Sequence, residues 1–154
     1  MPKVVFCILF LLTACGFKPV HDDTKPSMTS VYVSPIDKTR NGQLLKAELE
    51  DLLNPSRLSA DAKYILDISY DYNVEGLGIT SNRIASRYNI VLTTSYTLTE
   101  AATGNEVLNG QETAITSYNR VDSEFAIFVS KQNAINHALR QVALQVRNSL
   151  LAII

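Results

Sequence analysis

Apolar and polar residues alternate along two stretches in the middle of the chain. From Tyr64 to Val74, and again from Ile84 to Leu98, apolar side chains recur mainly at even-numbered positions. Successive side chains of a strand point to opposite faces, so this period predicts two strands that each bury one face. Residues 75–82 lie between them and contain two glycines. We expect this segment to be the loop of a hairpin.

Two further segments are typical of strands. Thr29–Ser34 is rich in β-branched and aromatic residues and is ended by Pro35. Glu106–Ser117 follows a Gly-containing turn and has a weaker apolar pattern. The apolar positions of that pattern include Leu108, Ala114 and Ile115.

The helical period appears in two other segments. Leucines recur at helical spacing from Gly42 to Leu53, where Asn54 and Pro55 end the pattern. A longer helix is predicted from Glu124 to Ala152, after Asp122 or Ser123 as N-cap. The apolar stripe of this second helix comprises Phe128, Ile135, Leu139, Val142, Val146 and Leu150.

The element order βαβββα predicts an α+β fold. Each strand has one apolar face and each helix one apolar stripe, and two helices packed on one face of a four-stranded mixed sheet would bury both. A right-handed crossover through the first helix would make the first two strands parallel neighbours or near neighbours.

The lengths of the elements predict an elongated single domain. A chain of about 140 residues forms a sphere roughly 37 Å across. The strand from Ile84 to Leu98 would span about 50 Å, and the last helix about 43 Å. The alternative is a compact globule with a bent strand and a kinked helix.

The amino terminus has the pattern of a secretory signal. Lys3 precedes nine apolar residues, Val4–Leu12, a run too short to span a membrane, which takes roughly 20. Residues 12–15, Leu-Thr-Ala-Cys, resemble the lipobox of bacterial lipoproteins, in which a diacylglyceryl group is joined to the cysteine sulfur. We therefore expect lipidation at Cys15; the alternative is a buried thiol beside a cleaved signal.

These features predict three regions. Residues 1–14 would be a lipoprotein signal peptide, 15–28 a lipidated tether with Pro19 and Pro26, and 29–154 the folded domain. Gly16 follows the cysteine, and the sorting rule known for enterobacterial lipoproteins then implies the periplasmic side of the outer membrane.

The composition and the missing motifs argue against several classes of function. With 46% hydrophobic residues the chain is too apolar to be disordered. Its 14 Lys and Arg residues, Lys3 among them, against 15 Asp and Glu give no global attraction for nucleic acid. His21 and His137 share no motif, and nucleophile, phosphate-loop and metal motifs are missing from the sequence. We expect no catalysis, cofactor or metal.

One end of the predicted fold would collect cations. The hairpin loop, the end of the fourth strand and the start of the last helix should meet there, with Arg83, Arg87, Arg120 and Lys131. Arginine forks and lysine ammonium groups suit phosphate recognition. These residues are candidates for binding a phosphorylated glycolipid, and scattered solubilising charges are the alternative.

Three segments together resemble the LptE family of lipopolysaccharide-assembly lipoproteins, in its alphaproteobacterial form. They are Cys15-Gly16-Phe17-Lys18-Pro19, residues 86–110 (SRYNIVLTTSYTLTEAATGNEVLNG) and residues 117–151 (SYNRVDSEFAIFVSKQNAINHALRQVALQVRNSLL). The resemblance covers essentially the whole chain after the signal.

The resemblance implies a non-enzymatic role at the outer membrane. Members plug a β-barrel lipopolysaccharide transporter, LptD-like, help to assemble it, and contact lipopolysaccharide. Lipidation carries over to Cys15, and lipopolysaccharide contact to Arg83, Arg87 and Lys131. The rival hypothesis is a free periplasm-facing lipoprotein, a structural adaptor or small-ligand binder without a barrel partner.

Overall fold

A computed structural model describes residues 31–54, 62–79 and 85–153. They form two helices and four strands in the predicted order βαβββα. The elements are β1 (Val31–Val33), α2 (Arg40–Leu53), β2 (Tyr64–Ile79), β3 (Ala85–Glu100), β4 (Glu106–Asn119) and α3 (Glu124–Leu151).

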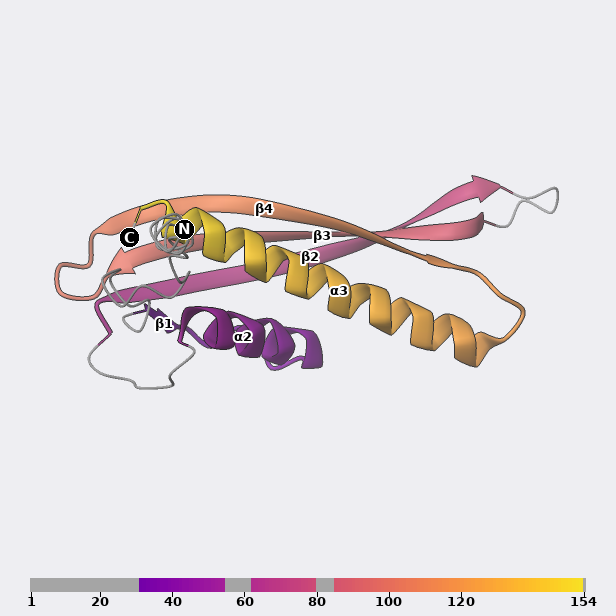
Figure 1. Ribbon diagram of the computed structural model, residues 1–154, viewed down its shortest axis with the longest axis horizontal. Coiled ribbons are helices and arrows are strands. Elements are labelled where there is room, and N and C mark those ends of the chain that lie inside the picture. Colours follow the sequence, from indigo (N-terminus) through magenta and orange to yellow (C-terminus); the bar gives the residue numbers. More distant parts are fainter. Residues whose placement is uncertain (1–30, 55–61, 80–84, 154) are drawn as a thin grey trace, which may run out of the picture.

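The sheet is mixed and its strands follow the chain, in the order β1-β2-β3-β4. β1 runs parallel to β2, with Val31 opposite Tyr64, and the other two pairs are antiparallel. Both helices lie on one face of the sheet, and the body is elongated because β2, β3 and α3 run nearly its whole length (Figure 1). The predicted fold class is confirmed.

The predicted hairpin loop at 75–82 is wrong over its first part. β2 continues to Ile79, and Gly76 and Leu77 pair with Tyr88 and Arg87 of β3. A partner strand that offers backbone hydrogen bonds over the whole length outweighs the weak strand preference of two glycines. Residues 80–82 lie outside the described part of the chain.

The core lies between the helices and one side of the sheet. The side chains pointing to this side from β2 and β3 sit at even positions, as the alternation predicts, and Leu66, Ile90 and Leu92 are completely buried. From the helices the core receives a leucine stripe and a longer mixed stripe. These residues are Leu45, Leu49, Leu53, Ile135, Ala138, Leu139, Val142, Ala143, Val146 and Leu150.

A hydrogen-bonded cluster ties the start of α2 to the sheet. Thr39, the N-cap, accepts from the Gly42 N–H through Oγ1 at 3.1 Å and donates to Asp37 Oδ1 at 2.6 Å. From β2, the Tyr70 hydroxyl donates to Asp37 Oδ2 at 3.1 Å. The hydrogen bond from Thr39 lowers the pKa of Asp37, and burial raises the pKa of Tyr70.

The lowered pKa of Asp37 predicts an acid-dependent contribution to stability. Because the folded state favours the carboxylate, the contribution is present above the ordinary pKa of 3.8 and is lost as pH falls through the lowered value. Asp37→Asn should therefore flatten the dependence of the unfolding free energy on pH between about pH 2 and pH 5. Urea unfolding measures this, and an unchanged slope would contradict it.

Gly110 of β4 leaves room for the ring of Tyr96 on β3. A Cβ at Gly110 would stand 2.5 Å from Tyr96 Oη and 2.7 Å from Cζ. Gly110→Ala should therefore cost about 1–3 kcal/mol of unfolding free energy, because the buried ring must shift. Gln111→Ala, at the exposed neighbouring position, should change it by less than about 0.5 kcal/mol. Equal thermal denaturation of the two variants would show that the close contact does not matter.

Candidate functional site

The structure describes three of the five predicted site residues. Arg87 lies on β3, Arg120 directly follows β4, and Lys131 lies in the second turn of α3. Cys15 and Arg83 lie outside the described residues, so their roles stay predictions.

Arg87 and Arg120 come together where β3 and β4 pair. Arg87 lies opposite Asn119, and its guanidinium donates to Ser117 Oγ from Nε at 3.1 Å and from Nη2 at 2.5 Å. The backbone N–H of Arg120 donates to the Ser86 carbonyl at 2.9 Å. These bonds hold the last residues of β4 against the first residues of β3, and both arginine side chains are exposed.

Lys131 lies at the same end of the molecule but on a different branch. Figure 1 shows the hairpin end of β2 and β3 on one side of that end and the first turns of α3 on the other. Among the described residues, neither the Lys131 nor the Arg120 side chain makes a hydrogen bond or an ion pair. The three cations therefore share one end of the body, which we call the cationic end.

A hollow lies between the last residues of β4 and α3 at this end. It encloses about 430 Å³ and is bordered by Tyr118 and Asn119 on one side and Asn133 and His137 on the other. Tyr118 stacks on Tyr88 with ring centroids 5.3 Å apart. Burial raises the pKa of Tyr118 above its ordinary value of 10.0. Hydrogen-bonding and aromatic groups line the hollow together with the apolar Val121 and Ala134.

An apolar surface at the same end escaped the sequence analysis. Phe125 is 76% exposed and Phe128 is 61% exposed, with Val121 and Val129 also open to solvent. The prediction that Phe128 belongs to the buried stripe of α3 is therefore wrong. We call these four residues the apolar cap.

The cause is the unequal length of the two helices. α3 has 28 residues and α2 has 14, about 42 Å against 21 Å. The first residue of α2, Arg40, donates from Nη1 to Gln132 Oε1 at 3.0 Å, so α2 begins beside Gln132. The turns of α3 before that point extend beyond α2 (Figure 1). Comparing the two helix lengths in the sequence would have given this signal.

No group of three or more His, Cys, Asp or Glu side chains in the described residues is placed to hold a metal ion. In the same residues, no helix has the length and the hydropathy needed to cross a membrane.

The described residues form an elongated α+β body that exposes cations and apolar side chains at one end. The family model described as LptE, lipopolysaccharide-assembly, matches residues 28–150, and the chain belongs to this family. The predicted resemblance is thus confirmed, and with it a role in lipopolysaccharide assembly. No curated protein matches the chain in sequence.

Solved structures share the fold. A protein from Caulobacter crescentus CB15, described as a lipoprotein, is 22% identical with a TM-score of 0.64, covering 80% of this chain and 89% of its own. A minor lipoprotein from Acinetobacter baumannii is 16% identical with a TM-score of 0.63, at 82% and 94% coverage. Rare lipoprotein B from Shewanella oneidensis is 13% identical with a TM-score of 0.60, at 80% and 92%.

Substitutions in the apolar cap test its exposure, because changing side chains that already meet water should have little effect on stability. Phe125→Ser with Phe128→Ser should change the unfolding free energy by less than about 1 kcal/mol, because both side chains already meet water. Leu139→Ala, in the buried part of the same helix, should cost about 2–5 kcal/mol. A double serine variant as unstable as Leu139→Ala in chemical denaturation would contradict the exposed placement.

Proposed function

We propose that this chain is an outer-membrane lipoprotein that plugs and helps to assemble the β-barrel lipopolysaccharide transporter, and that it contacts lipopolysaccharide during transfer. The observation that carries the proposal is the family match over residues 28–150, joined to an elongated body. A narrow body whose long strands and long helix lie along one axis suits insertion into the lumen of a large barrel.

The anchor would be the acylated Cys15. One acyl chain binds a membrane only marginally, whereas two chains hold a protein stably. The segment 16–28, fully extended, would reach about 43–47 Å. The folded body could therefore enter a barrel while its lipid stays in the inner leaflet of the outer membrane.

The cationic end would contact lipopolysaccharide. The Arg120 and Lys131 side chains have no partner among the described residues. The Arg87 guanidinium donates two hydrogen bonds to the Ser117 hydroxyl oxygen, and its other N–H groups have no partner among the described residues. These groups can meet lipid A phosphates. The apolar cap lies at the same end and suits the acyl chains of the same molecule. Competition for both parts would hinder aggregation of lipopolysaccharide.

Charge reversal tests the ligand contact. Arg83→Asp with Arg87→Asp should weaken binding of lipopolysaccharide to the purified protein by about tenfold or more, since charge-assisted hydrogen bonds to phosphate are lost. Association with the barrel should be unchanged. Arg140→Asp is the control, because Arg140 lies on the helix side and pairs with Glu48 at 2.8 Å. Unchanged binding in the double variant would remove the cationic end from the mechanism.

Co-purification from outer membranes in mild detergent tests the barrel partnership. A plug should be recovered in a stable one-to-one complex with a large barrel. Recovery of the chain alone would favour the free lipoprotein instead.

A further inference from the structure

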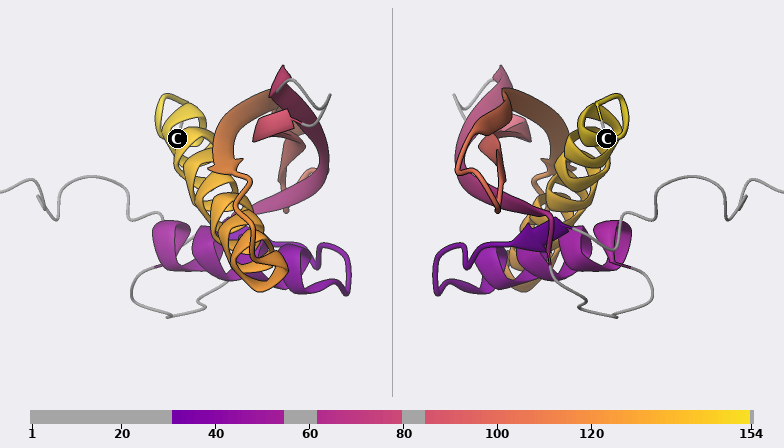
Figure 2. Two further views of the ribbon diagram at one scale, coloured as in Figure 1. Left: turned by 90° about the vertical axis from the view of Figure 1, so that its right-hand side faces the viewer. Right: turned by 90° about the vertical axis from the view of Figure 1, so that its left-hand side faces the viewer.

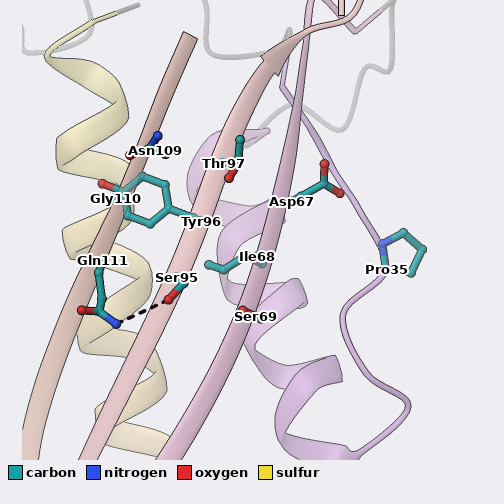
Figure 3. A pocket seen from close by; sticks show the side chains of 10 residues that line it. All are labelled: Pro35, Asp67, Ile68, Ser69, Ser95, Tyr96, Thr97, Asn109, Gly110 and Gln111. Atoms are coloured by element: carbon teal, nitrogen blue, oxygen red, sulfur yellow. Dashed lines mark hydrogen bonds between the residues drawn. The ribbon is translucent and has the colours of Figure 1, made fainter. Parts of the chain in front are cut away.

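The face of β2, β3 and β4 that points away from both helices is rich in short polar side chains. We call its central part, formed by residues 67–73, 91–97 and 109–115, the outer sheet face. Its central rows carry short hydroxyl and amide side chains, with Ser69, Ser95 and Gln111 in one row and Thr93 beside Thr113 in the next. Gln111 Nε2 donates to Ser95 Oγ at 3.5 Å (Figure 3). The Thr93 and Thr113 hydroxyls lie 3.3 Å apart.

The outer sheet face is hollowed along these rows. One hollow of about 590 Å³ extends from Pro35 across Ser69 and Ser95 to Gln111. A second, of about 300 Å³, shares Ser69, Ser95 and Gln111 with the first and continues to Thr93. The two form one polar groove across three strands.

Two carboxylates border this groove. Asp67 lines the first hollow and Asp71 the second, and both are exposed. Neither makes a hydrogen bond or an ion pair with any described residue. In the part of the described outer face formed by residues 67–73, 91–97 and 109–115, these two aspartates are the only charged side chains. That part of the face has no lysine, arginine or glutamate.

The helix side of the molecule differs. Two ion pairs join charged side chains there, Lys46 with Glu50 at 3.4 Å and Arg140 with Glu48 at 2.8 Å. Long charged side chains that pair on a solvated surface are typical of a face that remains in water. Lysine and glutamate are depleted in the cores of protein interfaces, as they are on the outer sheet face.

The edges of the sheet also indicate that a partner covers this part of the molecule. β1 pairs with β2 only over Tyr64–Leu66, so the rest of β2 has no strand beside it on that side in the described sheet. Neither β2 nor β4 contains lysine, arginine or proline, and the charged side chains of both strands are carboxylates. Long exposed edges are an aggregation hazard unless a partner covers them.

We propose that the outer sheet face is the surface that lies against the inner wall of the barrel partner, with lysine or arginine side chains of that wall reaching into the groove to Asp67 and Asp71. This inference rests on the proposed function. The lumen of a large outer-membrane barrel is polar, so hydroxyl and amide groups can replace its water contacts. Short side chains also lose little conformational freedom on assembly.

An apolar contact completes this surface. Val91 of β3 pairs with Ile115 of β4 on the same face, and Ile115 is 60% exposed. A second copy of this chain fits the face less well, because two such faces would bring unpaired carboxylates together.

The test uses the full lipidated chain, expressed in cells with its barrel and recovered through an affinity tag. Asp67→Lys with Asp71→Lys should lower the barrel recovered per molecule of chain at least tenfold. Glu48→Lys with Glu50→Lys makes the same change of charge on the helix side and should lower it less than twofold. Protease resistance of each variant in membranes reports folding.

A second pair of variants keeps the test decisive if a lysine variant fails to fold. Ser95→Arg places one long cation in the centre of the groove, and Asn148→Arg places one on the exposed side of α3. Loss of the barrel with Ser95→Arg alone supports the inference. Equal loss with both arginine variants, no loss with either, or loss only with Asn148→Arg overturns it.

The same experiment separates this inference from the function on which it rests. If the unaltered chain brings down no barrel, the proposed function fails and the inference fails with it. If the unaltered chain brings down the barrel and the helix-side variants abolish recovery, the function stands and the assigned face is wrong. Recovery of a second copy of the chain, lost in the Asp67 and Asp71 variant, would assign the face to self-association and overturn the inference.

Discussion

The seam between α3 and the helix-facing side of the sheet is the contact on which the structure depends. Val142, Ala143 and Val146 are completely buried in it, and small side chains at Ala134 and Ala138 let the helix approach the strands closely. Figure 2 shows α3 beside the curved sheet and α2 below both, so the two helices divide the cover of the core between them. Since α3 has 28 residues and α2 has 14, α2 does not reach the first turns of α3.

In this arrangement the helices bury one side of the sheet, and several other surfaces stay exposed to solvent. The apolar cap and the cationic end lie beyond the reach of α2, and the outer sheet face carries polar side chains and a groove. In a free-standing domain these surfaces would meet only water. Under the proposed function they would offer an end for lipopolysaccharide and a face for the barrel, at different places on the same body.

The sequence predicted the elements and their arrangement well, because both rest on short-range periodicity. Alternation placed Leu66, Ile90 and Leu92 in the core, and the structure confirms it. It failed where tertiary pairing decides: Gly76 stays in β2 because β3 continues opposite it. It failed again at Phe128, whose position fits the stripe of α3 although no second helix reaches it. Burial there depends on what lies opposite, which periodicity does not encode.

The candidate site was less predictable than the fold. Topology correctly brought Arg87 and Arg120 to one end, but their exposed geometry, the neighbouring phenylalanines and the polar groove depend on register and helix length. The groove in particular has no sequence motif, since serine and threonine on the open face of a strand are ordinary. It became visible only when three strands aligned those residues beside two unpaired carboxylates.

The central claim is that the fold is completed by a barrel wall lying on its open face. Photocrosslinking in living cells tests this most directly, with a photoreactive side chain introduced at Ser95 on the outer sheet face or at Gln141 on the exposed side of α3. The account predicts an adduct with a large outer-membrane protein from position 95 and none from position 141. Adducts from position 141 alone would contradict it.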